Sequence, residues 1–81
     1  MTVRYAIVIE DAGANFGAYA PDVPGCVATG KTVEETTANM REALEFHFEG
    51  LRELGQPVPE PSVQVSFVDV EIPHAQGNRN A

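Results

Sequence analysis

The pattern of apolar, polar and turn-forming residues predicts three short strands in the N-terminal half of the chain. The first spans Val3 to Glu10, where apolar residues such as Tyr5 and Ile7 occupy every second position. Its other face is also largely apolar, which is typical of a strand that is covered on both sides. Turn-forming residues separate it from two further strands, predicted at Phe16–Ala20 and Cys26–Thr29. The three strands are expected to form an antiparallel meander.

A long helix follows the meander. Thr32 and Glu35 form a capping box, in which the threonine accepts from the Glu35 amide and the glutamate reaches back. Gly55 is a helix stop, and Pro57 prevents the helix from continuing. Apolar or small side chains recur at alternating spacings of four and three residues and form one stripe: Val33, Thr37, Met40, Leu44, His47, Leu51 and Leu54.

A fourth strand is predicted at Val63–Ile72, after a stiff proline-containing connection at residues 56–61 and before Pro73. The element order is then β-β-β-α-β, and a right-handed crossover would place the last strand parallel to an earlier one. The predicted fold class is α+β: an antiparallel meander plus a crossover strand, with one helix on one face. Residues 1–72 are expected to form the domain, and residues 73–81 a disordered tail.

One helix covers only one face of a sheet, so the other face, which bears side chains such as Tyr5 or Tyr19, needs another cover. A chain of 81 residues has a thin core, and self-association would bury more of its surface. We therefore expect a homo-oligomer, a dimer or tetramer, with Tyr5, Phe46 and Phe48 as candidate interface residues, because aromatic side chains dominate interface cores. For Phe46, an isolated exposed aromatic is an equally good interpretation.

The charge balance narrows the choice of partner. Five Lys and Arg residues against 12 Asp and Glu residues give a net charge of −7. This disfavours direct binding to nucleic acid or to an anionic membrane and suits a basic protein. The single cysteine needs no oxidising compartment, and neither a membrane-spanning run nor a signal peptide is recognisable. We expect a cytoplasmic protein with no membrane association.

No set of residues indicates catalysis. Adjacent strand residues such as Glu10 and Asp11 point to opposite faces, so they do not form a metal site by themselves. His47 has no partner one helical turn away and is expected to be packed or interfacial, and Cys26 is expected to be a small buried residue rather than a nucleophile. Residues 25–32 formally match a phosphate-loop pattern but are needed for the third strand. We expect no catalytic residue, no metal and no cofactor.

Several ordered motifs resemble the HicB-like antitoxin family of type II toxin–antitoxin systems. They are P-D-x-P-G-C within Tyr19–Cys26, G-x-T-x-E-E within Thr29–Glu35, and the stretches Asn39–Leu44 and Gly55–Pro61. The resemblance spans about Val3 to Val70. It implies a truncated ribonuclease-H-like domain without nuclease activity that binds and occludes a HicA-like toxin, a small basic mRNA endoribonuclease.

The first motif supplies candidate partner-binding residues. The prolines and the glycine could instead serve only to shape the turn between two strands. Asp22 could do both. The residues that match the family motif are Tyr19, Pro21, Asp22, Pro24, Gly25 and Cys26.

Three further expectations follow from the sequence. Many members of the family carry a C-terminal DNA-binding segment, whereas residues 71–81 hold one basic residue, Arg79, so operator binding is not expected of this chain alone. One alternative function is a solitary protein-interaction or regulatory domain with no toxin partner. Another is a degenerate ribonuclease-H-type metal nuclease.

Overall fold

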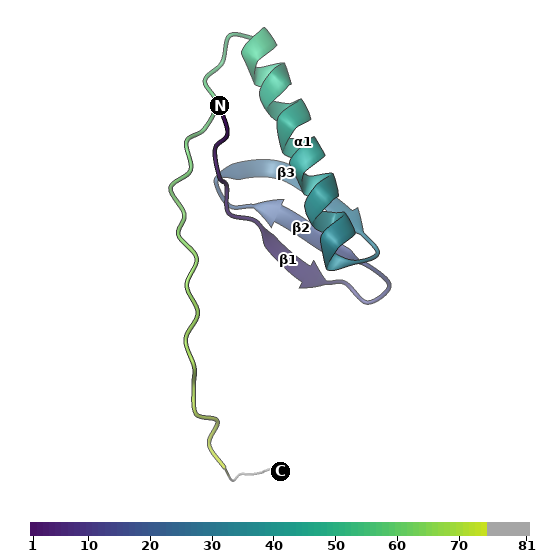
Figure 1. The fold of residues 1–81 in the computed structure, drawn as a ribbon, viewed down its shortest axis with the longest axis vertical. Coiled ribbons are helices and arrows are strands. Elements are labelled where there is room, and N and C mark those ends of the chain that lie inside the picture. The colour runs from purple at the N-terminus through teal and green to yellow at the C-terminus, as the bar shows by residue number, and fades with distance from the viewer. Residues whose placement is uncertain (75–81) are drawn as a thin grey trace.

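One helix lies across one face of a three-stranded sheet in the computed structural model, which describes residues 1–74 (Figure 1). The elements are β1 (Val8–Asp11), β2 (Phe16–Ala20), β3 (Val23–Gly30) and α1 (Val33–Glu53). The strands lie in the order β1-β2-β3, and each pairs antiparallel with the next. The α+β class, the meander and the helix are therefore confirmed.

The core lies between α1 and the face of the sheet that the helix covers. Small side chains in β2 let the helix approach the sheet closely, because Ala18 and Ala20 are buried on this face while Tyr19 between them is exposed. Thr36 on the helix is also fully buried. The buried apolar residues are Ala18, Ala20, Val23, Cys26, Met40 and Leu44.

The predicted signals set both ends of α1. The Glu35 amide donates to Thr32 Oγ1 at 2.9 Å, and the Glu35 carboxylate accepts from the Lys31 amide at 2.6 Å. At the other end Gly55 has φ +71°, and its amide donates to the Arg52 carbonyl oxygen at 3.0 Å. This left-handed residue satisfies a free carbonyl of the last turn. The cap at Thr32 and the glycine stop are confirmed, and Glu35 reaches back as expected but to the amide of Lys31, one residue before the cap.

Only the middle of the predicted helical stripe is buried. Met40 and Leu44 contact the sheet, whereas Val33 and Leu54 at the two ends are 44% and 73% exposed. A 21-residue helix is about 32 Å long, and a strand of eight residues spans about 26 Å, so α1 extends beyond the sheet. The end of α1 near Leu54 therefore presents apolar surface to solvent.

Gly30 brings the end of β3 against the start of α1. A Cβ atom at this position would lie 2.6 Å from Thr36 Oγ1 and 2.7 Å from the Thr36 amide nitrogen. The Thr36 hydroxyl is already committed, because it donates to the Thr32 carbonyl oxygen at 2.7 Å. Only glycine fits at position 30 without moving the helix.

The first strand is shorter than predicted. We expected it to span Val3–Glu10, but β1 begins at Val8, which pairs with Tyr19 near the end of β2. Residues 3–7 lie beyond that end, so they have no strand beside them in the described chain.

Tyr5 lies on the face of the sheet that the helix covers, and its predicted place on the open face is wrong. It shares this face with Ile7 and Ile9, which pack against the core, and its ring centroid is 5.1 Å from that of Phe48. Ile9 is paired with Ala18, which is buried under the helix. Tyr5 lies four residues before Ile9, so the alternation of side chains places it on the same, core-facing side.

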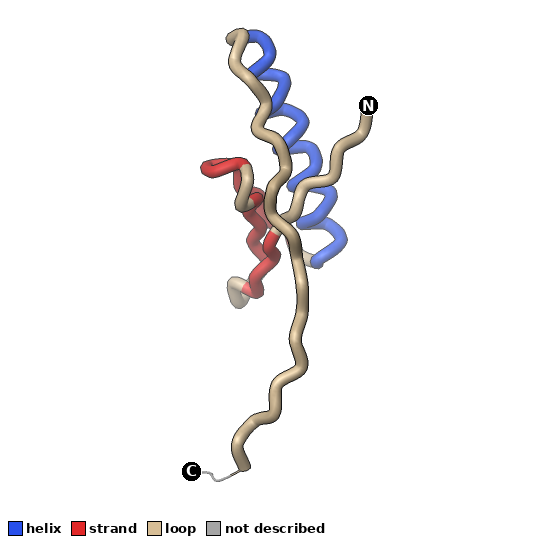
Figure 2. The backbone as a smooth tube through the Cα atoms, turned by 90° about the vertical axis from the view of Figure 1, so that its left-hand side faces the viewer, coloured by secondary structure: helices blue, strands red, loops and turns tan. Residues whose placement is uncertain are grey.

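The predicted fourth strand at Val63–Ile72 does not form within the described chain. Residues 62–74, the C-terminal arm, run away from the sheet and the helix in both views (Figure 1, Figure 2). A strand is held by hydrogen bonds to a neighbouring strand, and the arm meets none among residues 1–74 of its own chain. The predicted disordered tail at 73–81 lies mostly outside the described residues.

Replacing Gly30 tests the contact between β3 and α1. We expect Gly30→Ala to lower the free energy of unfolding by about 1–3 kcal/mol, because the new methyl group must displace Thr36. In a domain of this size that corresponds to a melting temperature lowered by about 4–8 °C per kcal/mol. Gly17→Ala is the matched control, since nothing lies within 4 Å of its Cβ position. Equal melting temperatures for the two variants would contradict the contact.

Candidate functional site

The P-D-x-P-G-C motif forms the turn between β2 and β3 and an irregularity at the start of β3. Ala20 pairs with Val23, but the preceding residue Tyr19 pairs with Val27, so three residues of β3 have no partner in β2. Within this bulge Gly25 has φ +88°, a conformation that favours glycine. Such an irregularity turns side chains away from the regular alternation of a strand. The unpaired residues are Pro24, Gly25 and Cys26.

Asp22 binds the start of the C-terminal arm. Its Oδ1 accepts from the Ser62 hydroxyl at 2.7 Å, and its Oδ2 accepts from the amides of Ser62 and Val63 at 2.9 and 3.1 Å. The hydrogen bond from the Ser62 hydroxyl, followed by the two amides, holds the pKa of this carboxyl below its ordinary value of 3.8. One side chain thus joins positions 40 residues apart in the sequence.

A second contact holds the connection that leads to the arm. The Tyr5 hydroxyl donates to the Pro59 carbonyl oxygen at 2.6 Å. Because the Tyr5 ring also packs against Phe48, this residue joins the N-terminal segment, the helix and the connection. Together with Asp22, it sets the point at which the chain leaves the domain.

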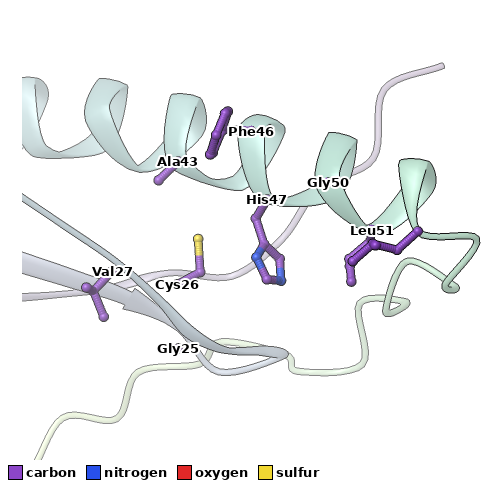
Figure 3. A pocket seen from close by; sticks show the side chains of 9 residues that line it. Gly25, Cys26, Val27, Ala43, Phe46, His47, Gly50 and Leu51 are labelled. Carbon is purple, nitrogen blue, oxygen red and sulfur yellow. The ribbon is translucent and has the colours of Figure 1, made fainter.

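An open apolar groove of about 400 Å³ lies between the bulge of β3 and the C-terminal half of α1. His47 and Leu51 point from the helix toward the bulge, and Gly25 and Cys26 lie opposite them (Figure 3). The margins are exposed: Val27 is 64%, Phe46 79% and Leu54 73% accessible to solvent. Apolar side chains gathered beside a groove are typical of a binding surface.

Carboxylates follow the solvent side of this groove. Glu42, Glu49 and Glu53 are exposed and lie at helical spacing beside Phe46, so they form an acidic row along α1. The groove therefore combines an apolar floor with a negatively charged margin.

The six candidate residues of the motif do not form one site. Gly25 and Cys26 line the groove, and Asp22 faces the C-terminal arm instead. Tyr19 lies on the open face of the sheet and is 43% exposed, and the two prolines are exposed in the turn and the bulge.

The three candidate interface residues do not lie on one surface either. Tyr5 and Phe48 pack against each other within the chain, while Phe46 is exposed at the groove. The sequence did not predict that Leu54 and Val27 line the groove, because their position there depends on how far the helix extends beyond β3. The contact of Asp22 with Ser62 was missed because no local pattern joins residues so distant.

The residues considered as candidates for catalysis have structural surroundings. Cys26 is 7% exposed, and burial raises the pKa of its thiol, which disfavours the reactive thiolate. Asp11 accepts from the Gly13 amide at 2.9 Å in the turn after β1. Across residues 1–74 there is no group of three or more His, Cys, Asp or Glu residues arranged to hold a metal ion. In the same range, no helix has the length and apolar character needed to span a membrane.

Residues 5–75 match the family model described as the HicB-like antitoxin of a bacterial toxin–antitoxin system. The chain is 34% identical over 86 aligned residues to an uncharacterised 14.9 kDa protein of the rep-hol intergenic region of Haemophilus phage HP1. That match covers 90% of this chain and 65% of the phage protein, so the chain spans less than two thirds of that relative. It is also 34% identical over 70 residues to the UPF0150 protein ssr1765 of Synechocystis sp., covering 85% of this chain and 89% of that relative.

Two solved structures share the fold. The N-terminal domain of the Burkholderia pseudomallei antitoxin HicB has a TM-score of 0.64 and 33% identity, over 73% of this chain and 70% of that one. A chain of the HicA3 and HicB3 toxin–antitoxin complex has a TM-score of 0.65 and 35% identity, over 74% and 70% of the two chains.

The contact between Asp22 and the arm should depend on pH. Because the pKa of Asp22 is lowered in the folded protein, its contribution to stability is fully present above pH 3.8 and is lost as the pH falls through the folded-state pKa. Amide resonances of Ser62 and Val63, followed by NMR from pH 7 downward, should titrate with a midpoint below 3.8. Asp22→Asn should abolish this titration. A midpoint at or above the ordinary value would show that the carboxylate does not bind the arm.

Proposed function

We propose, from the premise that the chain belongs to the HicB-like antitoxin family of bacterial toxin–antitoxin systems, that it binds and occludes a HicA-like toxin. The toxin would be a small basic ribonuclease, and binding would take place in the cytoplasm, where such an enzyme meets mRNA. The antitoxin itself would act without catalysis, by covering the surface that the toxin uses on RNA.

The observation that carries this proposal is the likeness to a chain of the HicA3 and HicB3 toxin–antitoxin complex, at 35% identity and a TM-score of 0.65. The net charge of −7 supports it independently. An RNA-binding enzyme presents cationic groups to phosphates, and an acidic protein is attracted to the same groups and associates faster with them.

We assign toxin binding to the groove between β3 and α1. Phe46 is the largest exposed side chain at its margin, and aromatic residues surrounded by polar ones are typical centres of binding energy. The acidic row of Glu42, Glu49 and Glu53 would meet the basic surface of the toxin. The rival function, a solitary interaction domain without a toxin, would use the same groove for another protein.

The side chains that a nuclease would need support a non-enzymatic role. Asp11, at the end of β1, accepts a hydrogen bond from the Gly13 amide, and Glu10, which is paired with Gly17, lies on the opposite face of the sheet from Asp11. These neighbours therefore do not converge on one point. A degenerate metal nuclease would cleave RNA alone in the presence of Mg²⁺ and lose that activity in Asp11→Asn.

Changes in the groove should weaken inhibition of the toxin. We expect Phe46→Ala to raise the dissociation constant for a purified HicA-like toxin from the same genome about 30-fold, equivalent to about 2 kcal/mol. Glu49→Lys combined with Glu53→Lys should slow association, most strongly at low salt. Surface plasmon resonance measures both effects, and a ribonuclease assay measures inhibition.

Tyr19→Ala is the control, because Tyr19 lies on the face of the sheet opposite α1. It should inhibit the toxin as the unaltered chain does. If Tyr19→Ala fails and Phe46→Ala does not, the binding surface is the open face. If the unaltered chain binds no HicA-like toxin at micromolar concentration, the antitoxin role itself is wrong and the solitary interaction domain is favoured.

A further inference from the structure

We propose that residues 63–72 of one chain form a fourth strand on the sheet of a second copy, at the free edge of β1. This goes beyond toxin binding, because it concerns self-association through a different edge of the sheet.

The arm has the composition of a buried strand but lies in solvent. Between Pro61 and Pro73 it holds eleven residues without glycine or proline, rich in the β-branched and aromatic types that strands favour. All of its apolar side chains are exposed, with Phe67 91% and Val68 82% accessible. Six such side chains on one extended segment need a partner to exclude water. They are Val63, Val65, Phe67, Val68, Val70 and Ile72.

Contacts inside the chain direct the arm outward. Asp22 holds the amides of Ser62 and Val63 beside the β2–β3 turn, and Tyr5 holds the Pro59 carbonyl oxygen. From there the arm continues past the domain (Figure 2). The radius of gyration is 17.3 Å, whereas about 12 Å is expected for a compact chain of this length. The arm is thus positioned to reach another molecule.

The family match and the composition of the arm both distinguish it from a linker. The family match extends over residues 5–75 and therefore includes the whole segment that lacks a partner. A connection that served only as a linker would be rich in polar, glycine or proline residues, and residues 63–72 are not. A second copy is the partner that supplies both an arm and a matching edge in equal number.

The edge of β1 is open. β1 pairs with β2 on one side only, and residues 3–7 before it lie beside no strand in the described chain. These residues include half-buried apolar side chains such as Tyr5 and Ile7. An added strand along residues 3–11 would satisfy their backbone groups and extend the sheet from three strands to four.

The opposite edge is protected. β3 carries Pro24, which has no amide to donate, and Gly25 with φ +88° in the bulge. The Asn39 side chain further donates to the Thr29 carbonyl oxygen at 2.8 Å. Strand addition is therefore favoured at β1 and disfavoured at β3.

The pattern within the arm calls for cover on both faces. Val63, Val65 and Phe67 share one face of an extended strand, while Val68 and Val70 fall on the other. Next to β1, one set faces the α1 side of the sheet and the other faces the open side, where Val8, Tyr19 and Val27 are in register. An arm added to a partner's sheet would thus extend both faces of that sheet, with one set of its side chains beside Val8 on the open face.

The first test compares one substitution at two exposed phenylalanines. In sedimentation equilibrium the unaltered chain should be a dimer or a multiple of one, and Phe67→Glu should raise its dissociation constant more than about 100-fold. Phe46→Glu, in the groove, should change it less than about threefold. Val65→Pro, which removes a donor from the strand, should act like Phe67→Glu. A monomeric unaltered chain, or a dimer that only Phe46→Glu disrupts, would overturn the proposal.

The second test identifies the edge. In mixed samples of isotope-labelled and unlabelled full-length chains, NMR contacts should join residues 63–72 of one copy to residues 3–7 of the other. Contacts only within one copy, contacts to residues 26–30, or contacts only between two arms would each overturn the assignment to β1.

The two proposals fail separately. A monomeric Phe67→Glu variant that still inhibits the toxin supports two distinct surfaces. A dimer that survives Phe67→Glu overturns strand exchange and leaves toxin binding standing. If Phe67→Glu loses both activities while circular dichroism and melting temperature are unchanged, the toxin surface includes the arm, and its separation from the dimer edge is wrong.

Discussion

The hydrogen bonds of one carboxylate hold the first residues of the C-terminal arm. Asp22 accepts three hydrogen bonds from two consecutive residues, Ser62 and Val63, and with the Tyr5–Pro59 contact it determines where the chain leaves the domain after the connection. Charge-assisted hydrogen bonds of this kind are stronger than neutral ones. Asp22 of the P-D-x-P-G-C motif thus has a structural role that other residues of the motif do not share. Gly25 and Cys26 instead line the groove between β3 and α1. One short motif organises two separate regions.

The two edges of the sheet have different properties because different parts of the chain lie beside them. At β3, the bulge and the helix together form an apolar groove beside an acidic row, suited to a basic protein. At β1, an unprotected edge follows half-buried residues and is suited to another strand. Under the two proposals, a molecule this small would engage a toxin at one edge and a second copy at the other without competition between them.

Most of the helix and strands could be predicted from patterns that span only a few residues. The cap at Thr32, the stop at Gly55 and the strand at Phe16–Ala20 each depend on signals within a few residues, and each is confirmed. Errors arose where pairing decides the outcome. Residues 3–7 and 63–72 have the composition of strands, but a strand also requires a neighbour, and no pattern in a single chain states whether that neighbour belongs to the same molecule. The Asp22 contact was equally invisible, because it joins distant positions.

The extended arm has a consequence for the lifetime of the protein. Proteases need several residues of unstructured, accessible backbone to bind and cleave, and residues 63–72 offer such a stretch in an isolated chain. In a strand-exchanged dimer the same backbone would be hydrogen-bonded and withdrawn from attack. Since dimer formation depends on concentration, a falling supply of the protein would expose more arms and hasten the removal of the chains that remain. Abundance and turnover would then be coupled through one segment of ten residues.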